Sequence, residues 1–236
     1  MNTQPKYKRV LLKLSGEALA KGTDDILNHE YIDEVAGVIK KCVDAGAEVA
    51  IIVGAGNIWR GRSGGKMDRT RADSMGMLAT CINSLALQDA FCNAGLDARV
   101  MSAVQMDKFA ELYTADKARR HLDKKRVVIF ACGLGSPYFS TDTPSVIRAM
   151  EIGADALLLA KNVDYLYTAD PKLDPSAEKI EETTYTEIVN NRLHAIDLTA
   201  AVLAEDSGMP TVMFGLDKSE NIYRAIMGEK LGTVVK

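Results

Sequence analysis

Near its N-terminus the chain reads Val10-Leu11-Leu12-Lys13-Leu14-Ser15-Gly16, an apolar run that passes directly into a polar turn with glycine. Three further apolar runs end in a similar way. They lead into Gly54-Ala55-Gly56-Asn57, Gly133-Leu134-Gly135-Ser136-Pro137 and Ala160-Lys161-Asn162, the last without glycine. In a parallel α/β sheet, ligands bind outside the carboxyl ends of the strands, where glycine lets backbone N–H groups approach an anion. Several such turns, two of them with lysine, predict a site for a ligand that carries several phosphates.

Around these runs, strand-like and helix-like patterns alternate along the chain. The expected strands are Arg9–Leu14, Glu48–Val53, Arg99–Met101, Arg126–Ala131, Asp155–Leu159, Thr211–Phe214 and Gly232–Val235. The expected helices are Ile32–Val43, Asp73–Asn93, Val104–Leu122, Thr143–Ile152, Asp197–Asp206 and Ser219–Met227. This alternation predicts an α/β fold, a three-layer αβα sandwich around a mostly parallel central sheet. Because no linker, repeat or low-complexity segment interrupts it, we expect residues 1–236 to form a single domain.

Composition and charge narrow the class of protein. The chain has 236 residues, of which 47% are hydrophobic and 26% charged, as in an ordinary globular enzyme. Its net charge of −3 argues against non-specific binding to nucleic acid, which needs an excess of basic charge. The four cysteines form no Cys-x-x-Cys pair, so free thiols in a reducing compartment are the simplest interpretation.

No stretch of the sequence indicates export or a membrane. The first residues, Met1 to Lys6, hold no apolar signal segment. No apolar run approaches the roughly 18 residues that a membrane helix needs. We therefore expect a cytoplasmic protein with neither a membrane nor a nucleic-acid partner.

Lys13 ends a buried strand just before Ser15-Gly16. A lysine there can neutralise the charge that develops on a transferred phosphoryl group. The alternative is a lysine that extends from a strand end into water, and Lys13 alone does not decide between them. The turn is not a Walker loop, because no Gly-x-x-x-x-Gly-Lys-Ser/Thr occurs in the chain.

Basic residues follow the second turn closely. They are Arg60, Arg62, Lys66, Arg69 and Arg71. Such a cluster can clamp phosphates, although a run of charges is more often a solvated loop. The preceding glycine turn favours anion binding.

The third turn continues into a stretch rich in hydroxyl groups, Ser136 to Thr143. Its Asp142 is suited to orient Lys13 or a metal ion. Thr141 or Asp142 is equally suited to begin the following helix as its N-cap. Tyr138 and Phe139 suit either stacking on a base or filling the core.

A second polar cluster follows the fourth run. It comprises Lys161, Asn162, Asp164, Tyr167 and Asp170. An aromatic ring for stacking and acids for ribose hydroxyls suit an adenosine pocket. The alternative is a simple turn at Asp170-Pro171 with no role in binding.

Taken in order, several motifs resemble those of bacterial-type uridylate (UMP) kinases, in the amino-acid kinase superfamily. They are Tyr7 to Leu19, Gly56-Asn57-Ile58-Trp59-Arg60-Gly61, Met75 to Thr80, Pro137 to Thr143, Tyr167 to Pro171 and Met227-Gly228-Glu229. These motifs span nearly the whole chain. The resemblance implies transfer of the γ-phosphoryl group of ATP to UMP, with Mg²⁺ as cofactor, in pyrimidine nucleotide biosynthesis.

The resemblance also implies roles for individual residues. ATP would contact Lys13, Leu14, Ser15, Gly16, Gly56, Arg60, Asn162, Tyr167 and Asp170. UMP would contact Ala55, Asp73, Ser136, Pro137, Tyr138, Phe139, Ser140, Thr141, Asp142 and Thr143. Lys13 would be catalytic, with Asp142 and Asp197 as its acidic partners. The resemblance assigns no protein side chain as a metal ligand.

Assembly and regulation follow from the same resemblance. It implies a homohexamer, GTP activation and UTP inhibition. The helix Asp73–Asn93 carries more apolar residues than one buried face needs, which suits an interface or simply a deeper core. Where the family has a Gly-Phe-Gly segment that serves GTP, this chain reads Thr23-Asp24-Asp25-Ile26, so we expect weakened GTP activation. Ala55, Leu134 and Tyr165 depart from the family pattern near the substrates.

Two other functions compete with this interpretation. One is a superfamily phosphotransferase that acts on a carboxylate or carbamate. The other is a nucleotide-binding storage or regulatory assembly without catalysis. Asp73 and the Ser136–Thr143 stretch match nucleotide recognition and argue against the first, whereas Lys13, Asp142 and Arg60 argue against the second.

Overall fold

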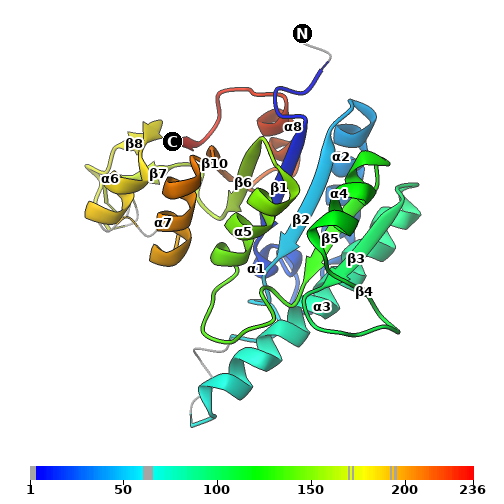
Figure 1. Cartoon of the computed structure of the whole chain (residues 1–236). Coiled ribbons are helices and arrows are strands. Elements are labelled where there is room, and N and C mark those ends of the chain that lie inside the picture. The colour runs from blue at the N-terminus through cyan, green and yellow to red at the C-terminus, as the bar shows by residue number, and fades with distance from the viewer. Residues whose placement is uncertain (1–3, 61–65, 170, 172, 192, 194–195) are drawn as a thin grey trace.

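The computed structural model describes residues 4–60, 66–169, 171, 173–191, 193 and 196–236. Within these residues, nine strands form one sheet in the order β4-β3-β5-β2-β1-β6-β10-β11-β9. Figure 1 labels the central strands of this sheet. The strands are β1 (Arg9–Leu14), β2 (Glu48–Val53), β3 (Ala98–Ser102), β4 (Glu111–Leu112), β5 (Val127–Ala131), β6 (Ala156–Lys161), β9 (Glu182–Thr183), β10 (Thr211–Gly215) and β11 (Thr233–Val235). A separate antiparallel pair comprises β7 (Leu166–Tyr167) and β8 (Lys179–Ile180). The pairing in the large sheet is parallel except between β10 and β11, so the predicted, mostly parallel sheet is confirmed.

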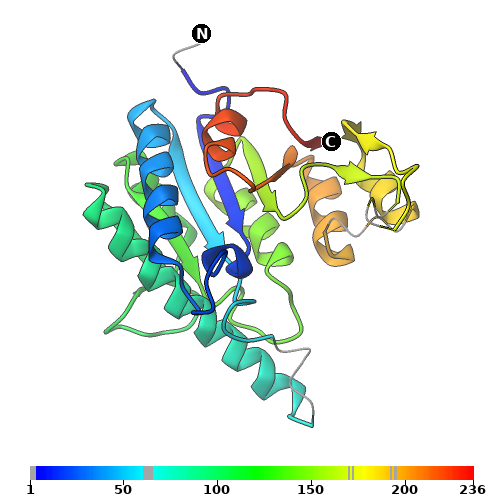
Figure 2. The same ribbon diagram turned by 180° about the vertical axis from the view of Figure 1, so that it is seen from behind.

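Helices cover both faces of the sheet because the side chains of each central strand alternate between two apolar cores. In β1, Val10 and Leu12 belong to one core and Leu11 to the other. The first core is covered by α2 (His29–Asp44), α3 (Arg69–Asn93) and α8 (Asn221–Ile226), seen in Figure 2. The second is covered by α4 (Ala115–Asp123), α5 (Asp142–Ile152), α6 (Tyr185–Asn190) and α7 (Leu198–Ser207). The three-layer αβα class is therefore confirmed.

The strand order brings the predicted turns to one edge of the sheet. Strand β1 lies between β2 and β6, and Lys13 is in register with Ile52 on one side and Leu159 on the other. Strand β5 lies on the far side of β2, where Phe130 is in register with Ile52. Because these four strands run parallel, the segments that follow them leave the sheet at the same end. The short helix α1 (Gly16–Leu19) begins there, directly after β1.

The predicted helix over Val104–Leu122 is wrong in its first half. Strand β4 occupies Glu111–Leu112 and pairs with the end of β3, so the helix α4 begins only at Ala115. Thr114 caps α4 by accepting a hydrogen bond from the Lys117 amide. Residues 104–110 form turns, and the Ser102 hydroxyl accepts a hydrogen bond from the Val104 amide at their start. Pairing with β3 therefore outweighed helix propensity in this stretch.

The long helix α3 differs from its predicted form in two ways. It begins at Arg69 rather than Asp73, because Asp68 caps it by accepting from the Arg71 amide. Part of its apolar stripe faces outward: Met75, Leu78 and Ile82 are 39%, 53% and 48% exposed. Across the described residues, no helix has both the length and the apolar character needed to cross a membrane.

Candidate active site

The turns after β1 and β2 touch, and only glycine fits between them. A Cβ atom on Gly16 would lie 2.5 Å from the Gly54 carbonyl oxygen and 2.7 Å from the Gly56 amide nitrogen. Helix α3 holds this junction from behind, because buried Asn83 donates its Nδ2 hydrogen to the Gly54 carbonyl oxygen at 2.8 Å. The backbone of both turns is therefore fixed, with no side chain of Gly16 or Gly56 between it and a ligand.

A cavity of about 410 Å³ opens at these turns. The candidate residues that line it are Lys13, Ser15, Gly16, Ala55, Gly56, Arg60, Asp73, Ser136, Phe139, Ser140 and Thr141. Residues proposed for ATP and residues proposed for UMP thus share one space. The proposed contacts of the first two turns and of the Ser136–Thr143 stretch that are not part of its lining are Leu14, Pro137, Tyr138, Asp142 and Thr143, and Leu14 is instead buried in the core.

Lys13 is held by a carboxylate. Its Nζ lies 2.6 Å from Oδ1 of Asp142, and the side chains are only 12% and 14% exposed. The backbone amide of Asp197 donates to the other oxygen of Asp142 at 3.3 Å. Burial alone would raise the pKa of Asp142, but the charges of Lys13 and Lys161 outweigh it and hold that pKa below its usual value. Asp142 therefore stays ionised and fixes the position of the Lys13 ammonium.

Lys161 is a second cation at this place that the residue assignments above missed. Burial, and then the nearby charge of Lys13, lower its pKa to about 8, although Asp142 and Asp197 oppose this shift. Its position at the end of β6, beside β1, brings it there. The signal in the sequence was the polar residue that ends the fourth apolar run.

Asp197 lies beside the Lys13–Asp142 pair and also stabilises the start of a helix. It caps α7 by accepting a hydrogen bond from the Ala200 amide at 2.8 Å. Its carboxylate also accepts hydrogen bonds from the hydroxyls of Ser140 and Thr143. These contacts join the start of α7 to the loop before α5, with Thr143 itself buried.

Asp73 bridges α3 and the loop after β5. Its Oδ2 accepts hydrogen bonds from Nε of Arg69 at 2.7 Å and from the Tyr138 amide at 2.9 Å. Tyr138 has a positive φ of 72° and an exposed side chain, whereas its neighbour Phe139 contributes to the lining of the cavity. Arg69, from the basic cluster, is therefore placed at the cavity wall.

A second cavity adjoins the first, and Glu17 lines both. It contains the candidates Asn162 and Tyr167, and Tyr167 donates its hydroxyl hydrogen to Asp164 at 2.7 Å. Glu17 also forms an ion pair with Arg60. The sequence assignments missed Glu17 and Lys21. Glu17 lies inside the motif from Tyr7 to Leu19, directly after Gly16, and Lys21 lies just beyond its end. Asp170 lies outside the described residues.

Two of the departures from the family pattern fall in the first cavity. Ala55 and Leu134 both line it, so each adds apolar bulk at the cavity wall where the family has a smaller or a hydroxyl-bearing residue. Tyr165 lines neither cavity and instead lies under the Lys179 ammonium, 4.6 Å from its ring centroid.

Comparison with known proteins agrees with the geometry of the site. Residues 8–215 match the model of the amino acid kinase family. The structure is similar to that of UMP kinase from Bacillus anthracis, with a TM-score of 0.94 and 39% identity over 98% of this chain and 96% of that one. It is also similar to UMP kinase from Ureaplasma parvum, with a TM-score of 0.92 and 34% identity over 98% and 99% of the two chains. Uridylate kinase from Archaeoglobus fulgidus is more distant, with a TM-score of 0.75 and 27% identity over 96% and 99%.

These similarities confirm the resemblance to bacterial-type UMP kinases that the sequence motifs predicted. The matched range includes β1, with Lys13, and extends to the end of β10. The chain belongs to the amino acid kinase family.

Proposed function

We propose that this chain is a cytoplasmic, single-domain UMP kinase, which transfers the γ-phosphoryl group of ATP to UMP and releases UDP and ADP in pyrimidine nucleotide biosynthesis. One observation carries the proposal: the Lys13 ammonium lines a cavity bounded by three glycine-containing turns, and a second cavity adjoins it at Glu17. Two adjoining cavities suit a reaction between two nucleotides. The similarity to the two bacterial UMP kinases supports this choice of substrate.

Lys13 is suited to stabilise the transferred phosphoryl group. In phosphoryl transfer, charge is spread over the three non-bridging oxygens, and catalysis rests on positioning and charge neutralisation. A lysine that is nearly buried and oriented by Asp142 supplies a fixed positive charge without reorganisation. The attacking phosphate of UMP is already ionised at neutral pH, so the reaction needs no general base.

The two nucleotides would occupy different parts of the site. We assign the ATP phosphates to the turn from Lys13 to Gly16, with Gly56 and Arg60, and the adenosine to the second cavity with Asn162 and Tyr167. A contact of ATP with Asp170 stays a prediction from the family resemblance. We assign UMP to the other side of the first cavity. Its contacts would be Ala55, Asp73 and the residues Ser136, Pro137, Tyr138, Phe139, Ser140, Thr141, Asp142 and Thr143.

The donor set beside Lys13 fits Mg²⁺. Asp142 remains ionised, and carboxylate oxygens are the hard ligands that Mg²⁺ prefers alongside substrate phosphates. The ATP phosphates would hold the ion, with the Asp142 carboxylate beside Lys13 as the nearby acid suited to orient it. When bound, Mg²⁺ supplies further neutralisation of the phosphate charge.

A coupled assay of ADP release tests the proposed function. UMP, CMP, dUMP and acetylglutamate are compared as acceptors at equal concentration with MgATP. We expect UMP to be the best acceptor and acetylglutamate to give no ADP above background. Turnover with acetylglutamate and not UMP would indicate a carboxylate kinase. Binding of ATP and UMP without ADP release would indicate a regulatory assembly.

We also propose that the chain assembles as a homohexamer through α3. The exposed residues Met75, Leu78 and Ile82 recur at a helical spacing and form an apolar stripe on its outer side. Light scattering at micromolar concentration is expected to report a hexamer, and Leu78→Glu with Ile82→Glu is expected to lower the mass. A monomeric wild-type protein would contradict this part of the proposal.

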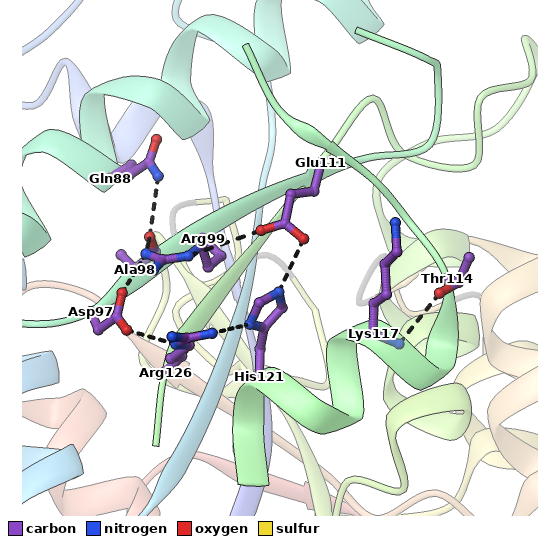
Figure 3. Close-up of polar contacts among 9 residues, drawn as sticks. All are labelled: Gln88, Asp97, Ala98, Arg99, Glu111, Thr114, Lys117, His121 and Arg126. Carbon is purple, nitrogen blue, oxygen red and sulfur yellow. Dashed lines mark hydrogen bonds and ion pairs between the residues drawn. The ribbon is translucent and has the colours of Figure 1, made fainter. Parts of the chain in front are cut away.

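Regulation is the last part of the proposal: GTP activation is weak or absent. Asp24 and Asp25 put negative charge in the segment that serves GTP in the family. Two other basic residues with the potential to hold a triphosphate, Arg99 and Arg119, are already ion-paired. Figure 3 shows Arg99 between Asp97 and Glu111 in a network that also contains His121 and Arg126.

The same assay, run at limiting ATP, tests the regulatory proposal. GTP is expected to leave the rate nearly unchanged, because phosphates would have to displace the carboxylates paired with Arg99 or with Arg119. A several-fold stimulation would contradict it. UTP inhibition remains a prediction from the family resemblance, and added UTP tests it directly.

A further inference from the structure

A buried arginine lies behind the turn that follows β5. Arg148 is part of α5 and only 6% exposed. Its Nη1 donates a hydrogen bond to Oε2 of Glu151, in the same helix, at 2.6 Å. Its guanidinium carbon lies 3.7 Å from the ring centroid of Tyr113, the residue after β4. A charge removed from water needs such partners, because an unpaired buried charge is costly.

The third partner of this guanidinium is a backbone carbonyl at the cavity. Nη2 of Arg148 donates to the Gly133 carbonyl oxygen at 3.4 Å, a long hydrogen bond. Gly133 has a φ of 55° and lines the first cavity together with Leu134 and Ser136. Arg148 itself is not among the described residues that line this cavity. Its effect on the cavity is therefore transmitted through the turn.

The other two partners orient the guanidinium. Tyr113 donates its hydroxyl hydrogen to the same Glu151 oxygen, also at 2.6 Å. Burial and this hydrogen bond raise the pKa of Tyr113, so its hydroxyl stays protonated and continues to donate. The Tyr113 ring in turn packs edge-on against Phe130 of β5, with 5.4 Å between the ring centroids. The planar guanidinium is thus fixed at one edge by a carboxylate and on one face by a ring.

The turn is held from the other face of the sheet by α3. The Cys132 amide donates to Oγ1 of Thr80 at 2.9 Å. Because α3 covers one core and α5 the other, two hydrogen bonds hold consecutive residues of the turn from opposite faces of the sheet. Cys132 has a positive φ of 63°, which is unfavourable for a residue with a side chain and persists only where the surroundings hold it.

Arg148 also joins the two ends of the segment that we assign to UMP. This segment leaves the sheet at Gly133, passes through Ser136–Thr143 and returns in α5, which carries Arg148. Its far end is fastened by hydroxyl groups that donate to Asp197. The contact with Arg148 fastens its beginning.

We propose that Arg148 is a positioning residue for UMP: its guanidinium holds the Gly133 carbonyl group, and with it the start of the segment that binds UMP. The effect on UMP rests on the proposed function, whereas the effect on the turn does not. The alternative is an arginine that only attaches α5 to Tyr113. The two roles differ at the turn, because attachment of α5 to Tyr113 does not involve Gly133.

Substitution of Arg148 by lysine separates these roles. Arg148→Lys keeps the positive charge and the ability to pair with Glu151, but it lacks the fork that reaches Glu151 and Gly133 together. Arg148→Gln loses the same fork and replaces Arg148→Lys if that variant does not fold. Tyr113→Phe is the matched control, because it removes one hydrogen bond of the cluster and leaves the guanidinium with its three partners. Urea unfolding compares the stability of the variants.

Amide hydrogen exchange of the full chain without nucleotide measures the turn itself. The Cys132 and Gly135 amides are both hydrogen-bonded, so their exchange reports opening of the turn. In peptides that cover residues 132–136, we expect exchange about tenfold faster in Arg148→Lys than in wild type and nearly unchanged in Tyr113→Phe.

Steady-state kinetics measure the consequence for the nucleotides. In Arg148→Lys the KM for UMP is expected to rise by about fivefold, whereas the KM for ATP and kcat are expected to change by less than about twofold. Tyr113→Phe is expected to keep both KM values near those of the wild type, even where its stability is lower.

The outcomes separate the inference from the proposed function. Faster exchange of the turn together with a selective rise in the KM for UMP supports the inference. Unchanged exchange in Arg148→Lys overturns it, whatever the loss of stability. Faster exchange with no rise in KM, or with an equal rise for both nucleotides, overturns the role in UMP binding. Failure of the wild-type protein to phosphorylate UMP contradicts the proposed function alone, and the exchange measurement still decides whether Arg148 holds the turn.

Discussion

The two ends of β1 carry similar charges but different surroundings. At the amino end, Arg9 contacts Glu48 at 2.7 Å, Asp123 at 2.6 Å and the Ile152 carbonyl oxygen at 2.8 Å. At the carboxyl end, Lys13 contacts a single carboxylate, that of Asp142. The first cation is surrounded by acceptors, whereas the second borders a cavity and has another lysine, Lys161, close by.

This difference separates a stabilising network from a binding site. Burial alone would raise the pKa of Glu48, but Arg9 and Lys125 outweigh it and lower that pKa. The buried carboxylate at the amino end is therefore paired with cations of the protein itself. At the carboxyl end, the Lys13 and Lys161 ammonium groups lie near Asp142 and Asp197, and Lys13 lines open space. A lysine held in place by a carboxylate at the edge of a cavity is suited to bind a phosphate.

Removing the cation at the carboxyl end is expected to have the largest effect. Lys13→Ala should lower kcat by about 10²-fold or more, because charge on the transferred phosphoryl group loses its fixed partner. Steady-state kinetics with UMP and MgATP measure this effect, and calorimetry shows whether UMP still binds. Lys8→Ala, at an exposed lysine just before the same strand, is the control. Near-normal turnover of the Lys13 variant would refute the catalytic role.

A smaller effect is expected from a substitution of Asp73, which lines the cavity. Asp73→Asn should raise the KM for UMP by about tenfold and the KM for ATP much less, because we propose that Asp73 binds UMP and because its carboxylate fixes the Tyr138 amide. The two KM values measured on one preparation give the comparison. If both rise equally, Asp73 serves only to hold α3 and the loop together.

The pH dependence of kcat/KM tests the second cation at the carboxyl end, Lys161. Because the pKa of Lys161 is lowered to about 8, kcat/KM should fall as the pH rises through that value and the charge is lost. This limb of the profile should disappear in Lys161→Met. Between about 8 and 10.5 the unfolded chain binds a proton that the folded chain has released, so stability rises with pH there. A rate that falls while urea stability rises therefore excludes unfolding as the cause.

At the amino end, we expect a change in stability and none in turnover. Arg9→Leu leaves Glu48, which is 6% exposed, with only Lys125, and should lower the free energy of unfolding by about 2–3 kcal/mol. Because the folded pKa of Glu48 is lowered, this contribution is present above 4.5 and lost as the pH falls through the folded pKa. Urea unfolding at neutral and acid pH measures both.

A matched control for this variant is Arg119→Leu, which breaks an exposed pair with Asp116 within one helix. It should cost less than about 1 kcal/mol. Equal losses in the free energy of unfolding would show that the network around Arg9 stabilises the fold no more than an exposed ion pair does.

The sequence predicts the central strands well because each is a short apolar run buried on both faces. Lys13, Asp73 and four residues of the Ser136–Thr143 stretch, all of them candidates from the sequence, line one cavity. What the sequence does not contain is the strand order. The closeness of Lys161 to Lys13 depends on the pairing of β1 with β6, which are separated by more than half of the chain.

The errors have a similar origin. The helix predicted over Val104–Leu122 yields to the pairing of β4 with β3, a contact that local propensity cannot foresee. The helix α6 was not predicted, although Thr184 and Glu187 form a capping box at its start. The outward stripe of α3 was ambiguous because a helix that packs on a sheet and a neighbour has apolar residues on two sides.

The contrast between the two ends of β1 is tested most directly by single-turnover transfer from γ-labelled ATP to UMP. Wild type, Lys13→Ala and Arg9→Leu are compared at saturating nucleotide and at a temperature where all three are folded. We expect Arg9→Leu to transfer the label at the wild-type rate and Lys13→Ala to be slower by about 10²-fold. Transfer at the wild-type rate in Lys13→Ala, or an equal loss in both variants, would contradict the account.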